Sequence, residues 1–181
     1  MVLRLGHRPS RDKRITTHLC LVARAFGAEG IYIAGIQDNG ISKSLDKIAG
    51  AWGGAFWVEF TSNPRRLLKD WKNKGGKIAH LTMYGVPVKK VIRKIAALEE
   101  ELLVVVGGEK VPRQYYLESD FNVAIGDQPH SEVAALAIFL DRITRSLWEE
   151  ALFKNARLRI IPSDKGKIVE QMGPKKESFL R

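Results

Sequence analysis

The sequence predicts an α/β domain in which helices cover both faces of a mainly parallel sheet. Short runs of β-branched and aromatic residues alternate along the chain with longer stretches of helical periodicity, and this alternation is typical of parallel sheets. The 181 residues, of which 45% are hydrophobic, provide enough apolar surface for one packed core. We therefore expect a main domain at residues 1–155 and a small C-terminal extension at residues 156–181.

Six strands are expected in the main domain, of which the first and the last have the weaker patterns. They are expected at residues 2–5, 31–34, 56–60, 78–82, 102–106 and 122–125. The run at 102–106 is the most hydrophobic, which predicts a position at the centre of the sheet.

Five helices are expected between and after these strands, and two of them begin with recognisable signals. They are expected at residues 17–26, 42–52, 64–74, 88–99 and 131–150. Asn63 is a favourable N-cap followed by a proline at the first helical position, and Ser131 opens the longest helix.

The C-terminal extension has the pattern of a β-hairpin. Residues 157–161 and 167–169 flank the turn sequence at 162–166, and a basic tail follows at 174–176.

The composition favours a polyanionic partner. Thirty Lys and Arg against twenty Asp and Glu give a net charge of +10, and each phosphate neutralised by such a chain releases condensed counterions. A solvated basic surface would give the same composition.

Cys20 is the only cysteine, which excludes an intramolecular disulfide and a cysteine zinc cluster. Without a bilayer-spanning apolar run or a signal-peptide pattern, we expect a cytoplasmic protein that does not contact membranes.

The N-terminal segment 4–18 is dense in directional hydrogen-bond donors. It holds four arginines, two histidines and two adjacent threonines where a strand passes into a helix. Arginine forks match phosphate oxygens, and a helix N-terminus adds positive potential. Arg14 and His18 share one helical face. The alternative is a solvated basic start with Thr16 or Thr17 as the N-cap.

The loops that follow three predicted strands are the second group of candidates. In open α/β sheets ligands bind at the carboxyl ends of the strands, which draws attention to residues 82–85, 107–112 and 126–131. Gly107 and Gly108 allow a close approach of backbone to a ligand, and Glu109 is an acceptor for its amine or hydroxyl. Each loop alone is also compatible with an ordinary turn.

Other reactive side chains point to no further site. His80 lies inside a predicted strand, where a hydrogen-bonded core histidine is the usual finding, and Cys20 has the place of a small hydrophobe on a helix. The sequence has no Ser-His-Asp arrangement, no paired catalytic carboxylates and no metal-ligand spacing. We therefore expect no metal.

Three segments together resemble the motifs of the SPOUT superfamily of knotted methyltransferases. Residues 104–110 resemble its second motif, an apolar strand that ends in G-x-E. Residues 131–135 resemble the third motif at the start of the last helix, and residues 24–28 occupy the place of the end of the first motif.

A closer resemblance, from residue 1 to about residue 172, is to the archaeal tRNA (cytidine-56 2′-O)-methyltransferase family. The matching positions are 7–8, 11–12, Arg14, 16–18, 107–112 and 128–132. The resemblance implies a homodimer, a trefoil knot near the C-terminus, S-adenosylmethionine as the cofactor and 2′-O-ribose methylation of tRNA. It places the cofactor against Leu81, Gly107, Gly108, Glu109, Lys110, Val111, Ile125, Gly126, Asp127, Gln128, Pro129, His130, Ser131 and Glu132.

The same resemblance suggests roles in the N-terminal segment. Ile15 and Leu21 stand where related ribose methyltransferases carry an asparagine and a catalytic arginine, so Arg14 is the replacement. Because an arginine is almost always protonated, Arg14 is better suited to orient groups and stabilise charge than to accept the proton of the ribose hydroxyl. His18 is therefore the second candidate for the general base. RNA contacts are expected from Arg8, Arg11 and Arg24.

The homodimer is expected to form through the helices at 17–26 and 131–150. One apolar face of the longer helix holds Val133, Leu136, Ala137 and Leu140, and we expect some of these in the interface.

Two alternative functions remain open. One is a base methyltransferase of the same superfamily, and the other is a non-catalytic RNA-binding protein of the same fold. The sequence at 107–109 argues against the second, because its glycine pair and acidic residue suit a cofactor loop.

Overall fold

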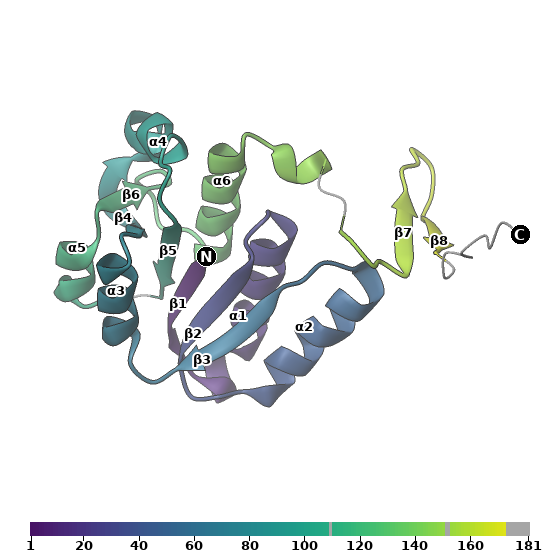
Figure 1. The fold of residues 1–181 in the computed structure, drawn as a ribbon, viewed down its shortest axis with the longest axis horizontal. Coiled ribbons are helices and arrows are strands. Elements are labelled where there is room, and N and C mark those ends of the chain that lie inside the picture. Colours follow the sequence, from purple (N-terminus) through teal and green to yellow (C-terminus); the bar gives the residue numbers. More distant parts are fainter. Residues whose placement is uncertain (109, 151–152, 173–181) are drawn as a thin grey trace, which may run out of the picture.

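The computed structural model of the chain describes residues 1–108, 110–150 and 153–172. Six strands form one parallel sheet in the order β3-β2-β1-β5-β4-β6 (Figure 1). They are β1 (Val2–His7), β2 (Gly30–Gly35), β3 (Trp57–Thr61), β4 (Lys77–Pro87), β5 (Leu102–Gly107) and β6 (Phe121–Ala124). The six predicted strands are thus confirmed, and β5 occupies the predicted central place between β1 and β4.

Helices cover both faces of the sheet, as predicted. They are α1 (Pro9–Ala25), α2 (Asn39–Trp52), α3 (Pro64–Asn73), α4 (Val88–Ala96), α5 (Arg113–Glu118) and α6 (Glu132–Thr144). Because side chains alternate along a strand, neighbouring residues of β1 enter different cores: Val2 packs with α1, α2, α4 and α6, whereas Leu3 packs with α3 and α5.

Helix α1 begins eight residues earlier than predicted. Pro9 occupies the first turn, and the Asp12 carboxylate accepts a hydrogen bond of 3.1 Å from the backbone N–H of Arg8, which precedes the helix. The hydrophobic pattern does not indicate this start, because the buried positions of the first two turns are occupied by the polar residues Asp12 and Thr16.

The last long helix is shorter than predicted, because α6 ends at Thr144. Arg145 adopts a left-handed conformation with φ 53°, and a short 3₁₀ helix follows at Leu147–Glu150. The Asp141 carboxylate accepts hydrogen bonds from Ser146 Oγ at 2.8 Å and Trp148 Nε1 at 3.0 Å. These bonds fold the chain back over the end of the helix. Helix α5, with only six residues, was not predicted because it is too short to show periodicity.

Strand β4 contains an excursion at its carboxyl end. Leu81 and Val86 both pair with Val123 of β6, so the four residues between them leave the ladder. A Cβ on Gly85 would lie 2.6 Å from the backbone of Asn122, and only glycine permits this approach.

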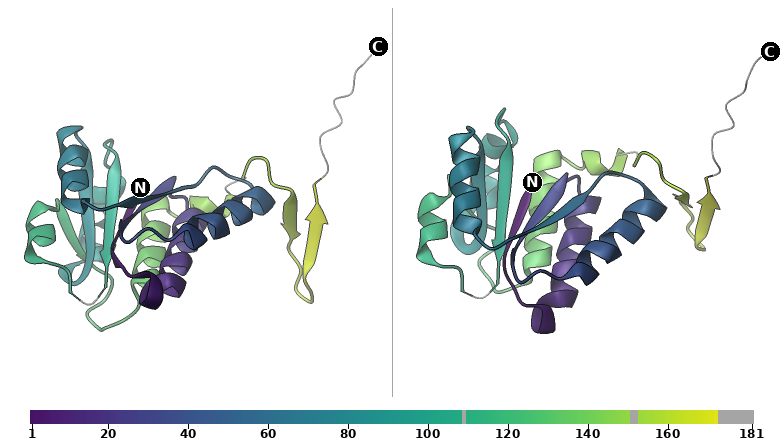
Figure 2. Two further views of the ribbon diagram at one scale, coloured as in Figure 1. Left: turned by 90° about the horizontal axis from the view of Figure 1, so that it is seen from below. Right: turned by 60° about the horizontal axis from the view of Figure 1, so that its bottom comes forward.

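The predicted hairpin is formed by β7 (Leu158–Ile161) and β8 (Ile168–Gln171), which pair antiparallel. It stands apart from the sheet, beyond the C-terminal end of α2 (Figure 2). There Arg157 donates from its backbone N–H to the Ala51 carbonyl of α2 at 3.0 Å. The basic tail at 174–176 lies outside the described residues. The trefoil knot and the domain boundary at 155 stay predictions.

Candidate functional site

The three predicted loops follow neighbouring strands. Since β5, β4 and β6 run parallel and lie side by side, their carboxyl ends meet at one edge of the sheet. Leu81, at the start of the β4 excursion, is 7% exposed and belongs to the larger core. The structure therefore brings the predicted loops 82–85 and 126–131, and the described residues 107–108 and 110–112 of the third, to a common edge.

The loop after β5 folds back over its own first glycine. A Cβ on Gly107 would lie 2.5 Å from Val111 Cγ2, whereas a Cβ on Gly108 would meet no atom within 4 Å. Lys110 is exposed. Glu109, the predicted acceptor, lies outside the described residues. The open space at Gly108 is room for a ligand against the loop backbone.

The loop after β6 is held closed by a histidine. His130 Nε2 lies 2.5 Å from the carbonyl oxygen of Ile125, across the loop. Gly126 has φ +76° and open space around its Cβ position. Asp127, Gln128 and Pro129, at the exposed tip, complete the predicted set in this loop.

Ser131 and Glu132 connect this loop to α6 and to the core. Ser131 Oγ accepts from the backbone N–H of Val133 at 3.1 Å and so caps α6, as its sequence position indicates. Glu132, a predicted cofactor residue, forms an ion pair of 2.9 Å with Arg4 of β1, and the two side chains are 12% and 3% exposed. The carboxylate of Glu132 is thus turned toward the core.

A second buried polar contact lies next to this pair, at the end of β1. His7 Nδ1 is 2.9 Å from Thr16 Oγ1 of α1, and His7 Nε2 is 4.0 Å from an Asp38 carboxylate oxygen before α2. Burial, followed by the charge of Arg4, lowers the pKa of His7. The carboxyl end of β1 is therefore tied to α1, α2 and α6 by polar groups.

Sequence reasoning missed this polar group, although one signal was present. Arg4 occupies an inward-facing position in the apolar run Val2–Leu5. A charged residue at such a position requires a buried partner. The identity of that partner, Glu132, is not encoded nearby, because 128 residues separate the two.

The predicted catalytic residues lie on the outer surface of α1. Arg14 and His18 are both exposed, and within the described part of the chain neither side chain has a hydrogen bond or ion pair. Helical spacing places them on one face, as predicted. The described residues of the loops after β4, β5 and β6 form no hydrogen bond or ion pair with these two side chains.

The three arginines predicted to bind RNA have different environments. Arg8 is exposed and pairs with Asp12 at 2.8 Å, and Arg11 is exposed. Arg24 is buried: its guanidinium donates to the Gly53 carbonyl and lies 4.5 Å over the ring of Phe153. The cationic group of Arg24 thus has a buried structural role, and its assignment to RNA binding stays a prediction.

The predicted interface face of α6 contributes in part to the core of its own subunit. Leu136 and Leu140 are buried in the core, whereas Ile138 is 41% exposed and Ile15 of α1 is 36% exposed. Val133 and Ala137, the other two residues of the predicted face, are half-buried, and a place for them in a dimer interface stays a prediction.

His80 and Cys20 are core residues, as expected. His80 Nδ1 lies 3.0 Å from Asn122 Oδ1, and its ring meets Tyr116 edge to face. Burial raises the pKa of the Cys20 thiol to about 12.

Among the described residues, no group of three or more His, Cys, Asp or Glu side chains is placed to hold a metal ion. No helix in the described ranges is long and apolar enough to cross a membrane.

Comparison with known proteins connects this geometry to a family. A family profile described as tRNA ribose 2′-O-methyltransferase, aTrm56, matches residues 52–170. The tRNA (cytidine(56)-2′-O)-methyltransferase of Methanopyrus kandleri is 54% identical over 172 residues, which cover 95% of this chain and 96% of that protein.

Solved structures share the fold at low identity. The TrmH/SpoU tRNA modifying enzyme of A. aeolicus matches with a TM-score of 0.59 and 17% identity, over 87% of this chain and 79% of that one. The SpoU methyltransferase AviRb of Streptomyces viridochromogenes, in complex with the cofactor AdoMet, matches with a TM-score of 0.53 and 14% identity, over 81% of this chain and 57% of that one. By the profile match and the identity to the Methanopyrus protein, the chain belongs to the aTrm56 family of tRNA ribose 2′-O-methyltransferases.

Proposed function

We propose that this protein transfers the methyl group of S-adenosylmethionine to the ribose 2′-hydroxyl of cytidine 56 in tRNA. The observation that carries the proposal is the pair of open glycines, Gly108 after β5 and Gly126 after β6, in a chain of this family. The two loops lie at the same edge of the sheet, on either side of β4. The glycines leave the backbone of both loops accessible at the edge where α/β proteins bind ligands.

The residues at this edge fit the cofactor. Leu81 and Ile125 are buried apolar side chains at the base of the loops, and they suit the non-polar parts of an adenosyl group. Above them, the backbone of 107–108, 110–111 and 125–131 offers N–H and C=O groups to its polar atoms. When bound, S-adenosylmethionine supplies the electrophilic methyl group, so orientation and electrostatics are left to the protein.

Arg14 and His18 are the groups that would act on the ribose. The guanidinium of Arg14 orients the substrate and stabilises developing negative charge, because it stays protonated at neutral pH. His18, one turn further along α1, is the candidate that accepts the hydroxyl proton. Both side chains are exposed and free to meet RNA.

We further propose that the enzyme is a homodimer in which Arg14 and His18 serve the cofactor loops of the partner. In their own subunit they point away from the sheet, and exposed Ile15 and Ile138 lie on neighbouring helices that are suited to an apolar contact. Sedimentation should give a dimer at micromolar concentration. A stable monomer at that concentration would contradict this arrangement. We place the enzyme in the cytoplasm, with tRNA as its partner.

Mass spectrometry of the nucleosides after incubation with tRNA and S-adenosylmethionine tests the reaction. We expect a methylated ribose at cytidine 56. A methylated base would instead indicate the base methyltransferase alternative, and binding of tRNA without any measurable binding of S-adenosylmethionine would indicate a non-catalytic RNA-binding protein.

A further inference from the structure

A basic hollow lies between α3 and α5, on the face of the sheet opposite α1 and α6. It has a volume of about 490 Å³. Its lining consists of Asn63, Arg65, Arg66, Leu68, Lys69, Lys72, Asn73 and Glu118. Four of these side chains are cationic and one is anionic, so the hollow carries a net positive charge. Nothing in the site described above uses it.

The sequence of α3 explains why the cations line an outer surface. Leu67, Leu68 and Trp71 pack toward the second core cluster. Arg65, Lys69 and Lys72 follow at spacings of four and three residues, which places them along one stripe of the helix. Seven residues of helix span about 10 Å, so the stripe presents an extended row of charges rather than a single point.

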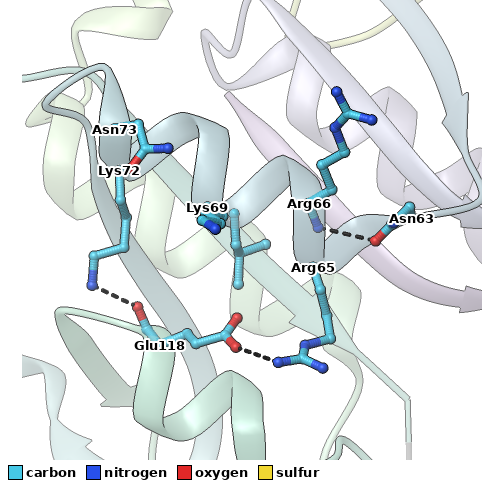
Figure 3. A pocket seen from close by; sticks show the side chains of 8 residues that line it. Asn63, Arg65, Arg66, Lys69, Lys72, Asn73 and Glu118 are labelled. Atoms are coloured by element: carbon cyan, nitrogen blue, oxygen red, sulfur yellow. Dashed lines mark hydrogen bonds and ion pairs between the residues drawn. The ribbon is translucent and has the colours of Figure 1, made fainter.

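Glu118 at the end of α5 holds the two ends of this row. Its carboxylate accepts from Arg65 Nη2 at 3.2 Å, and its backbone carbonyl accepts from Lys72 Nζ at 3.0 Å (Figure 3). Arg66 points away from this carboxylate in the same view. Lys72 Nζ also lies 3.7 Å from a carboxylate oxygen of Asp120. These contacts pre-order Arg65 and Lys72, which lowers the entropy lost when a ligand binds.

The cations remain accessible to a partner. The side chains of Arg65 and Arg66 are 58% and 79% exposed, and their ion pairs with Glu118 and Asp70 are on the surface. Surface pairs of this kind contribute little free energy. A phosphate can therefore replace either carboxylate as the partner of an arginine at small cost.

We infer that this hollow is a second contact surface for the sugar-phosphate backbone of tRNA, outside the site of methyl transfer. A row of exposed cations fits a chain of phosphates better than one small anion, and tRNA is the polyanion that the proposed function, on which this inference rests, supplies. Helix α5 begins directly after the cofactor loop at 107–112 and is about 9 Å long. The hollow is therefore close enough to contact the same RNA molecule.

The test compares two variants that each remove two charges at helical spacing i and i+4. Arg65→Gln/Lys69→Gln alters the hollow, and Lys43→Gln/Lys47→Gln alters exposed lysines of α2 on the opposite face. Each protein is titrated with full-length tRNA and with the isolated stem-loop that contains the target cytidine. Methyl transfer to the stem-loop and binding of S-adenosylmethionine are measured in parallel.

We expect Arg65→Gln/Lys69→Gln to weaken binding of full-length tRNA roughly tenfold near physiological salt, and to reduce the log–log salt slope by about 1.5 to 2. Methyl transfer to the stem-loop and cofactor affinity should stay at the wild-type level, as should every property of the α2 variant. A third variant, Asp70→Asn, removes a negative charge beside Arg66 and should tighten tRNA binding.

Two results would overturn the inference. One is unchanged tRNA binding by Arg65→Gln/Lys69→Gln, and the other is an equal loss in the α2 variant, which would assign the effect to net charge. Failure of the proposed function is distinguishable from both, because it would appear in the wild-type protein as absence of methyl transfer to either RNA.

Discussion

Arg4 and Glu132 form an ion pair of 2.9 Å that joins the central region of the sheet to the first turn of α6. Both side chains are nearly inaccessible, at 3% and 12% exposure. A buried charge without its partner costs several kcal/mol. The pair therefore fixes the start of α6, and with it the loop 125–131 that precedes the helix.

Removing one member of this pair should destabilise the protein more than removing both. We expect Glu132→Ala to lower the free energy of unfolding by about 3 kcal/mol, because the guanidinium of Arg4 stays buried and unpaired. Arg4→Met/Glu132→Ala should lose less than the sum of the two single variants. Urea denaturation of all four proteins measures the coupling, and additive losses would refute it.

Substitutions at the two adjacent glycines should separate cofactor binding from loop integrity. Gly108→Leu projects into open space, so we expect weaker binding of S-adenosylmethionine with an unchanged melting temperature. Gly107→Val brings its side chain against Val111 and should cost both affinity and stability. Calorimetric titration and thermal unfolding measure the two effects. Wild-type affinity in Gly108→Leu would show that the cofactor binds elsewhere.

Arg14→Ala should lower the methylation rate by orders of magnitude and leave the affinity for S-adenosylmethionine unchanged, because the exposed side chain is proposed to act on the ribose and not on the cofactor. Mixing this inactive variant with Gly108→Leu should restore activity, since a mixed dimer contains one intact site. Absence of restoration would contradict the action of Arg14 across the dimer. His18→Ala decides the base: a large loss of methylation rate, with unchanged affinity for S-adenosylmethionine and tRNA, assigns the proton to His18.

Arg11 and Arg24 should differ in their effects on RNA binding. Arg11→Ala should reduce the log–log salt slope of tRNA binding by about one, as expected for one lost phosphate contact. Arg24→Ala should leave that slope unchanged and lower stability by about 1 to 2 kcal/mol, because it removes a buried hydrogen bond and the contact with Phe153. Filter binding at several salt concentrations, together with urea denaturation, distinguishes the two.

Acidification should destabilise the protein through His80. Burial lowers the pKa of this histidine below the ordinary value of 6.5, so the folded state holds it neutral while the unfolded chain protonates it. Below about pH 6.5 the unfolded state therefore binds more protons, and the free energy of unfolding falls by at most about 1.4 kcal/mol per pH unit for this group. His80→Gln, which retains an amide for Asn122, should show a shallower pH dependence. An identical slope in both proteins would exclude His80 as the cause.

The sequence by itself determined the positions of the six strands along the chain, the helical cover of both faces of the sheet and the three loops at the carboxyl ends of β4, β5 and β6. These features depend on local signals: β-branched runs such as 102–106, the cap at Asn63, and glycines directly after a strand. Where the signal was local but polar, the prediction was wrong. The first two turns of α1 bury the polar residues Asp12 and Thr16. The start of the helix therefore lacks the alternation of apolar and polar residues by which an amphipathic helix is recognised.

Only the tertiary structure decided which polar residues are free and which are partnered. Arg24 and Arg14 are both arginines on one helix, yet the first is buried against Gly53 and Phe153 while the second faces outward. Arg4 meets Glu132 across 128 residues of sequence. The energy of a charged group depends on its solvent exposure and on partners that chain folding brings near, and neither quantity is a property of the neighbouring sequence.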